Sequence, residues 1–332
     1  MATAQYITPA QDEGDSDGVV DQDYDSLMTS VTSGIRDYQY ENGRRYHAYK
    51  EGKYILPNDE EEQDRLDTQY HAVRLAFDNK PFFAPIGDSP KAILDVGTGT
   101  GIWAIDVADQ YPSATVIGTD LSPIQPRWVP PNVQFEIDDL ESQWTYEPNK
   151  FDLIHTRILL GGSVLDWPAF FKQAFEHCKP GGFFECQELD VEVQSDDYDF
   201  PPDSHVKKWC RMQCEAALKA GRPLRIYPED VKSQIEAAGF FDVTVRPFKV
   251  PIGAWPADKR LQEAGVIQLA AMIEGVFGLS VALWTRFLGW KAEDVHAELA
   301  KVKEEFKSKK AHAYWPIYSI YGKKPTEATA KA

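Results

Sequence analysis

The sequence predicts an α/β fold: a doubly wound, mostly parallel sheet of seven strands with an N-terminal helical extension and a helical cap. Short apolar runs alternate with helical patterns of about 10–15 residues from residue 91 onward, which is typical of parallel βαβ units. A glycine-rich turn, "GTGTG" at 97–101, follows the first apolar run and leads into the first helical pattern. Two later segments, about 193–226 and 251–310, break this rhythm, and we interpret them as additions over the carboxyl edge of the sheet, where open α/β sheets bind ligands.

The strands are predicted from short apolar runs bounded by turn residues. The helices are predicted from caps and stops: Asp166 caps one helix whose first turn tolerates Pro168, and the acidic start "YPED" opens another that ends at Gly239. The predicted strands are Lys91–Val96, Thr115–Gly118, Asn132–Ile137, Phe151–His155, Phe183–Leu189, Phe241–Phe248 and Ala313–Tyr321, and the helices between them include Ile102–Gln110 and Trp167–Cys178.

The sequence divides into eight parts. The acidic first 30 residues bury too little apolar surface to offset ordering entropy, so we expect them to be disordered. The parts are a disordered acidic tail (1–30), an N-terminal helical lid or extension (31–90), a cofactor-binding core (91–192), a helical insertion (193–226), a core helix and strand (227–250), a helical cap (251–310), the last core strand (311–325) and a disordered tail (326–332).

The bulk composition excludes several classes of function. The chain of 332 residues is 43% hydrophobic, enough for one large domain with additions, and carries a net charge of −17 without a run of Lys and Arg. Such a chain repels phosphate backbones, so we expect no nucleic-acid partner. The N-terminus lacks the regions of a signal peptide, and four scattered cysteines indicate a reducing compartment. We expect the protein in the cytoplasm, with the nucleus as the alternative.

One apolar segment has the length of a membrane span, and one pair of cysteines has the spacing of metal ligands. Residues 264–284 are apolar over about the 20 residues that a span requires, but they include Glu274 and two glycines, which favours buried helices and no membrane association. Cys210 and Cys214 lie four residues apart near His205, but a zinc site there would lack its second ligand pair. We interpret the cysteines as buried hydrophobic residues and predict no metal.

The glycine turn and two aspartates indicate a charged cofactor. Glycines at 97, 99 and 101 do not match the dinucleotide spacing, whose third glycine would fall on Ile102. Asp95, two residues before the turn, suits an ammonium or sulfonium group better than phosphates. Asp120 ends the second strand about 20 residues after the turn, where an acidic side chain accepts from ribose hydroxyls.

These motifs resemble a known family. "LDVGTGTG", Asp120, "FEIDDLES" and "FDLIH" resemble motifs I to IV of class I S-adenosylmethionine-dependent methyltransferases. "ENGRRYHAYKEGKYILPNDEEEQDRLD", "DLSPIQPRWVPPNVQFEIDD", "CKPGGFFECQE" and "HAYWPIYSIYGKKP" resemble, more narrowly, the fungal LaeA-like methyltransferases. The resemblance runs from about Tyr38 to Pro325 and implies the class I fold with S-adenosylmethionine as cofactor.

The resemblance also implies roles for individual residues. The turn from Gly97 through Thr98 and Gly99 to Gly101 passes the methionine half of the cofactor, with Asp95 near its amino group. Asp120 holds the ribose, and Leu121 lies against the adenine. Asp139, followed by Leu140, contacts the adenine amino group, with Asp138 as the alternative, although either acid could simply cap the next helix. His155 faces the methionine portion or is a structural histidine.

Arg45 and Tyr46 are further candidates for the cofactor site, because a guanidinium fork fits a carboxylate. Their alternative is a solvated helix that packs on the sheet. A hydroxyl or ammonium acceptor requires a base, for which His155 and Glu188 are the first candidates, followed by Asp190 and His71. Arg157 either binds an anionic acceptor or belongs to a salt bridge.

Three functional hypotheses remain open. The first is methylation of a small-molecule acceptor, in secondary metabolism, because a helical cap encloses a compact molecule. The second, which the LaeA resemblance implies, is a nuclear regulator that works with protein partners. The third is a methyltransferase fold recruited for other chemistry.

Overall fold

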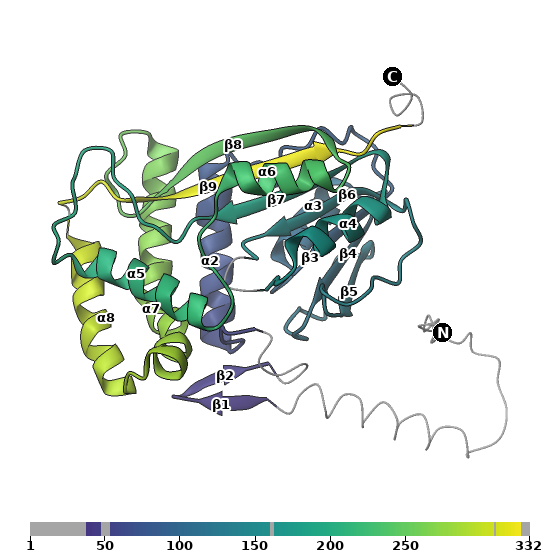
Figure 1. Cartoon of the computed structure of the whole chain (residues 1–332). Coiled ribbons are helices and arrows are strands. Elements are labelled where there is room, and N and C mark those ends of the chain that lie inside the picture. The colour runs from purple at the N-terminus through teal and green to yellow at the C-terminus, as the bar shows by residue number, and fades with distance from the viewer. Residues whose placement is uncertain (1–37, 48–53, 160–162, 309, 327–332) are drawn as a thin grey trace, which may run out of the picture.

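The computed structural model describes residues 38–47, 54–159, 163–308 and 310–326. Its centre is a seven-stranded sheet in the order β5-β4-β3-β6-β7-β9-β8, in which only β9 runs antiparallel to its neighbours (Figure 1). The predicted fold class is confirmed. The strands are β3 (Ala92–Val96), β4 (Thr115–Asp120), β5 (Val133–Ile137), β6 (Phe151–Arg157), β7 (Cys178–Leu189), β8 (Phe241–Pro251) and β9 (Tyr314–Lys323).

Helices cover both faces of this sheet. The helices α4 (Trp167–His177) and α6 (Pro228–Ala237) pack together on one face, and α2 (Glu60–Ala76) contacts α3 (Ile102–Gln110) on the other. Each side has its own core: Phe171 and Ile235 belong to the first, and Trp103 and Tyr70 to the second. Two apolar faces on a parallel sheet account for the continuous apolar runs of β3 and β6.

The predicted helix signals act as expected. Asp166 accepts a hydrogen bond from the backbone N–H of Ala169 and so caps α4, with proline in its first turn. Helix α3 occupies the predicted residues, and Gly239, with φ of +113°, follows α6. Several strands are longer than predicted, and the largest difference is at β7, which begins at Cys178, so "CKPGG" is already part of the strand, with a register shift where β7 pairs with β6.

The helical cap consists of α5 (His205–Lys219), α7 (Lys259–Leu288) and α8 (Ala292–Lys307), which pack together beside the sheet (Figure 1). Helix α7 is long and apolar enough to cross a membrane by length and composition, but 56% of its most apolar 18-residue window is buried in the fold. Glu274 points to solvent, while α2 packs along the buried side.

Two glycines of α7 make room for arginines. A Cβ atom on Gly275 would lie 1.9 Å from Cδ of Arg65, and one on Gly278 would lie 2.2 Å from Nη1 of Arg44. Arg65 comes from α2 and is paired with Glu62. The glycines that interrupt the apolar run are therefore sites of close packing, which let two buried cations lie against the backbone of α7.

The N-terminal extension contains a hairpin that the sequence did not predict. Strands β1 (Gln39–Glu41) and β2 (Arg44–Tyr46) pair antiparallel, within the segment predicted as a helical lid or extension. Asn42 and Gly43 between them both have positive φ, as a two-residue hairpin turn requires. Arg44 then holds the hairpin to α2 by a two-pronged bond to Asp59, the residue that caps α2.

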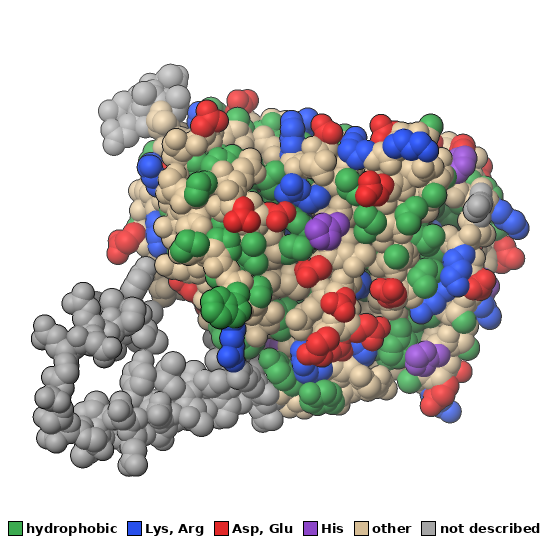
Figure 2. Space-filling view, turned by 180° about the vertical axis from the view of Figure 1, so that it is seen from behind, with side chains coloured by type: hydrophobic (Ala, Val, Ile, Leu, Met, Phe, Trp, Pro, Cys, Tyr) green, Lys and Arg blue, Asp and Glu red, His purple; other side chains and the backbone are tan. Residues whose placement is uncertain are grey.

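The outer surface mixes both signs of charge. Figure 2 shows Asp and Glu side chains interspersed with Lys and Arg over the face drawn there. Cys178, Cys186 and Cys210 are buried and Cys214 is partly buried, and all four are free thiols. Among the described residues, no group of three or more His, Cys, Asp or Glu side chains is arranged to hold a metal ion.

Candidate functional site

A cavity opens at the carboxyl ends of β3, β4 and β6, beneath the helical cap. It encloses about 1650 Å³ of empty space, open solvent at its mouth included. We call one part of its lining the cofactor half: Gly97, Thr98, Gly99, Asp120, Leu121, Ser122, Asp138 and Leu140. The other part, the cap half, comprises Leu189, Val191, Trp209, Gln213, Leu224, Leu279, Leu283 and Trp315.

The three glycines of the turn are required by backbone conformation. Gly97, Gly99 and Gly101 have φ of +72°, +59° and +82°, a region that other residues seldom adopt. A Cβ atom on Gly101 would lie 2.3 Å from the ring of Phe135, whereas one on Gly99 would meet only a leucine methyl group at 3.8 Å. Gly99 therefore faces the open cavity, and Gly101 lies against the sheet.

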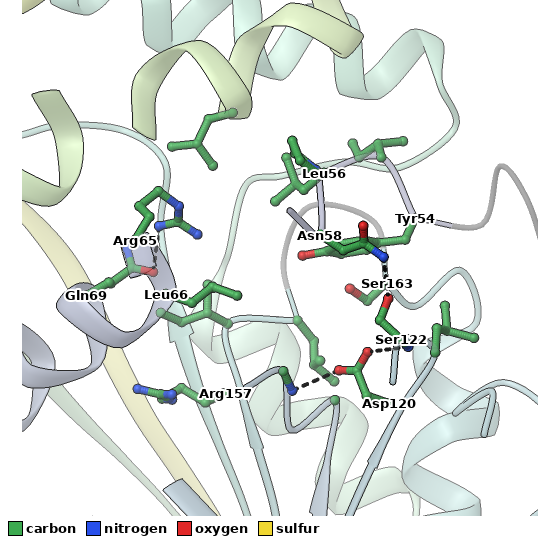
Figure 3. Close-up of a pocket in the computed structure, with 18 of the residues that line it drawn as sticks. Tyr54, Leu56, Asn58, Arg65, Leu66, Gln69, Asp120, Ser122, Arg157 and Ser163 are labelled. Atoms are coloured by element: carbon green, nitrogen blue, oxygen red, sulfur yellow. Dashed lines mark hydrogen bonds between the residues drawn. The ribbon is translucent and has the colours of Figure 1, made fainter. Parts of the chain in front are cut away.

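Asp120 connects the ends of two strands. Its carboxylate accepts from the backbone N–H of Gly99 at 2.8 Å and from that of Ser122 at 2.9 Å (Figure 3). Burial raises the pKa of Asp120 to about 6, and the neighbouring carboxylate of Asp95 adds to the rise, against the lowering effect of the two backbone bonds. The ionised form of such a buried carboxylate is stabilised by a ligand that donates hydroxyl hydrogen bonds to it or places a positive charge beside it.

Asp95 and His155 lie behind the wall of the cavity. Asp95 is 3% exposed and accepts from the hydroxyl of Thr98 at 2.7 Å. Its other oxygen lies 2.8 Å from Nδ1 of His155, whose ring stacks on Trp103 with centroids 3.8 Å apart. Neither residue lines the cavity, and the contacts of Asp95 with the amino group and of His155 with the methionine portion stay predictions. In this structure the pair supports the glycine turn through the bond from Thr98 to Asp95.

Of the two acids after β5, the alternative candidate lines the cavity and the preferred one does not. Asp138 is part of the lining, and so is Leu140. Asp139 is 2% exposed and turns away, accepting from the backbone N–H of Glu141 and the hydroxyl of Ser142. The geometry therefore favours Asp138 over Asp139 as the predicted contact with the adenine amino group, because Asp139 closes the turn that follows the strand.

The predicted N-terminal residues lie outside the cavity. The guanidinium of Arg45 bonds to Asn58 and Glu60 and lies 4.7 Å from the ring of Tyr38. Tyr46 is 3% exposed, with the guanidinium of Arg286 4.9 Å from its ring. A later stretch of the same segment, residues 54–58, lines the cavity, although none of its residues was among the predicted site residues.

The predicted bases are also set apart from the cavity. Glu188 is 1% exposed, and its carboxylate lies 3.4 Å from the backbone N–H of Leu159. Asp190 is held by Arg225 at 2.8 Å. Neither lines the cavity, and nor does His71. Each of these acids is engaged in holding the strand ends and the loops that surround the site.

The cavity has a carboxylate on one side and two arginines on the other. Figure 3 shows Tyr54, Asn58, Asp120 and Ser122 together on one side, and Arg65, Gln69 and Arg157 on the other. Asn58 donates to the hydroxyl of Ser122 at 3.2 Å, joining the N-terminal segment to the end of β4. The lining of the cap half is apolar except for Gln213, whose amide is held by Leu279 and Trp284.

This arrangement fits a ligand with a ribose and a positive charge. Asp120 provides a buried carboxylate at the end of β4, and Gly99 leaves its backbone open to the cavity beside it. Leu121, Ile124 and Leu140 add apolar surface of the kind that a purine ring covers. The cap half then provides an enclosed apolar space continuous with the first.

The chain is similar to known methyltransferases. The model of a methyltransferase domain family matches residues 68–245. Methyltransferase pytC of Aspergillus terreus is 40% identical over 304 residues, covering 91% of this chain and 93% of that protein. Secondary metabolism regulator LAE1 of Cochliobolus heterostrophus is 38% identical over 86% of this chain and 95% of its own length. Protein-methionine methyltransferase laeA of Emericella nidulans is 34% identical over 90% and 80%, respectively.

Solved structures are similar at lower identity. Phosphoethanolamine N-methyltransferase 2 of Haemonchus contortus, solved with phosphomonomethylethanolamine and S-adenosylhomocysteine, is 15% identical with a TM-score of 0.46. The alignment covers 93% of this chain and 75% of that one.

Proposed function

Because this chain belongs to the S-adenosylmethionine-dependent methyltransferases that carry this methyltransferase domain, we propose that its acceptor is an apolar small molecule of secondary metabolism. The observation that supports this most directly is the cap half of the cavity. Its leucines, Val191 and two tryptophans form an enclosed apolar space next to the cofactor half. Pockets of this composition take apolar small molecules, with a few polar groups to orient them.

S-adenosylmethionine supplies an electrophilic methyl group on a sulfonium. Asp120 would hold the ribose hydroxyls, Leu121 and Leu140 would enclose the adenine, and the backbone of Gly97 and Gly99 would lie along the methionine portion. The protein itself contributes alignment and exclusion of water, an effect that reaches about 7–11 kcal/mol in well-oriented systems. Helices α5 and α7 exclude water from the cap half, and Asp95 with His155 keeps the glycine turn in place.

A second function is favoured by the relatives named as secondary metabolism regulators, at 35–38% identity over most of the chain. A further relative, 34% identical, is named a protein-methionine methyltransferase, so a protein acceptor belongs to the same proposal. We propose the cytoplasm as the site of the metabolic function and the nucleus as that of the regulatory one.

One experiment separates the two functions. The gene is replaced by an Asp120→Asn variant in its own host, which is grown with isotopically labelled methyl-methionine beside the parent strain. Loss of one labelled metabolite and gain of its unmethylated precursor, with unchanged transcripts, supports the metabolic function. Loss of many unrelated metabolites together with their biosynthetic transcripts supports the regulatory one. An unchanged metabolite profile contradicts both.

A further inference from the structure

Arg157 stands at the end of β6 and lines the cavity. It is followed by Ile158, a β-branched residue with φ of +50°, which is an unusual and strained conformation for such a side chain. The backbone N–H of Ile158 donates to the carbonyl of Gln187 on the next strand at 2.8 Å, which fixes the turn. The strained residue, Ile158, therefore lies at the end of β6, where it and Arg157 line the cavity.

The charge of Arg157 is poorly compensated. Its guanidinium lies 4.5 Å from the ring of Tyr70, and the described part of the chain places no carboxylate within 4.0 Å of it. Desolvation lowers the pKa of Arg157 and the nearby cation Arg74 adds to that effect, while Tyr70, Asp95 and Asp67 oppose it without forming an ion pair. The other cavity arginine differs: Arg65 donates two bonds to Glu62 and one to Gln69.

We propose that Arg157 is the anion-binding residue of the cavity, and that it takes a carboxylate or enolate oxygen of the bound molecules. This assignment rests on the proposed methyl-transfer function, and it specifies in addition that one of the bound molecules carries a negatively charged group. A guanidinium fork in a largely apolar space binds a planar oxyanion by two parallel N–H bonds. Arg157 also lies on the opposite side of the cavity from Asp120, so a ligand that spans the cavity meets a negative group at one end and a positive group at the other (Figure 3).

Two molecules can supply this oxyanion. One is the cofactor itself, whose methionine portion carries a carboxylate. The other is an acidic acceptor that projects from the cap half. Both are recognised by the same chemistry, so the test compares ligands that carry the carboxylate with ligands that lack it.

The variant is Arg157→Gln, which keeps a polar side chain of similar length. Its matched control is Arg246→Gln, because Arg246 also lies 4.5 Å from an aromatic ring, that of Phe83, but outside the cavity. Calorimetry measures the binding of S-adenosylhomocysteine and of 5′-methylthioadenosine, which lacks the carboxylate. Saturation-transfer NMR on the protein with bound S-adenosylhomocysteine compares 2-naphthoate with 2-naphthamide. Thermal melting checks that each variant folds.

We expect Arg157→Gln to weaken S-adenosylhomocysteine by about 10- to 100-fold, as the loss of a charge-assisted pair predicts, and to leave 5′-methylthioadenosine unchanged. That result assigns the oxyanion to the cofactor. Unchanged S-adenosylhomocysteine affinity, with a preference for naphthoate over naphthamide that the variant loses, assigns it to the acceptor. Unchanged S-adenosylhomocysteine affinity without such a preference overturns the inference. A wild-type protein that does not bind S-adenosylhomocysteine contradicts the proposed function instead.

Discussion

The cofactor half and the cap half of the cavity are built in different ways. The cofactor half comes from consecutive strand ends, β3, β4 and β5, and its geometry is set by the backbone: positive φ at Gly97 and Gly99 and backbone N–H groups on Asp120. The cap half combines single side chains from β7, α5, α7 and β9, as far apart in the chain as Leu189 and Trp315.

The two halves therefore differ in the substitutions that they tolerate. The cofactor half depends on a few positions where the backbone admits only glycine, or where a carboxylate accepts from backbone N–H groups, so single substitutions there have large effects. The cap half depends on the volume of its apolar side chains, and apolar packing tolerates exchanges that conserve volume.

The largest effect is expected for Gly101→Ala, compared with Gly275→Ala of the cap. The alanine at 101 combines a left-handed conformation with a Cβ atom 2.3 Å from Phe135, so we expect a loss of about 2–5 kcal/mol in the free energy of unfolding. At 275 the backbone is helical and alanine gains propensity, but its Cβ atom would lie 1.9 Å from Cδ of Arg65, which is buried and held by Glu62 and Gln69, so about 1–3 kcal/mol is expected. Urea denaturation measures both, and equal losses would contradict the distinction.

Asp120→Asn removes the charge of the cofactor half with almost no change in side-chain volume. We expect S-adenosylhomocysteine to bind about 30- to 100-fold more weakly, because hydrogen bonds from ligand hydroxyls to a charged acceptor are lost. Asp139→Asn is the control: its carboxylate closes a turn outside the cavity, and affinity should stay within about threefold. Isothermal titration calorimetry compares the two, and similar losses for both would disprove the assignment of the ribose to Asp120.

Val191→Phe tests the cap half by filling it. Val191 lines the cavity and is only partly buried, so the larger ring can enter the space without disrupting the core. We expect transfer of labelled methyl groups to a metabolite extract to fall about tenfold or more, by loss of acceptor fit, while S-adenosylhomocysteine affinity stays within about twofold. Weaker cofactor binding in this variant would show that the two halves are not independent.

The smallest effect is that of pH. The pKa of Asp120 is raised to about 6 in the folded protein, above the ordinary value of 3.8, so the free folded state binds the proton more tightly than the unfolded state. Its contribution to stability is full below pH 3.8 and is lost as pH rises through 6.

Cofactor binding has the opposite dependence, because it requires the ionised carboxylate. Calorimetry should show about fourfold weaker S-adenosylhomocysteine binding at pH 5.5 than at pH 7.5. The Asp120→Asn variant should lack this dependence. A wild-type affinity that does not change over this range would mean that another group controls ionisation in the site.

The sequence predicted the parts of the site that depend on local order. The glycine turn, Asp120 and Leu121 lie in the cavity because strand, turn and helix follow one another along the chain. It did not predict which of Asp138 and Asp139 turns inward, since both satisfy the same pattern and only the turn after β5 distinguishes them. Arg45 and Tyr46 were chosen for their chemistry, but the hairpin that carries them packs on α2 and α7. The cap half could not be assigned residue by residue, because it exists only after long-range packing.

The position of β9 has a consequence for synthesis on the ribosome. This strand, near the carboxyl end of the chain, lies between β7 and β8 and pairs with both. Until it has left the exit tunnel, β7 and β8 each present an unpaired edge, and such edges join readily to those of neighbouring chains. A polypeptide that is truncated or stalled before Tyr314 should therefore aggregate or recruit chaperones.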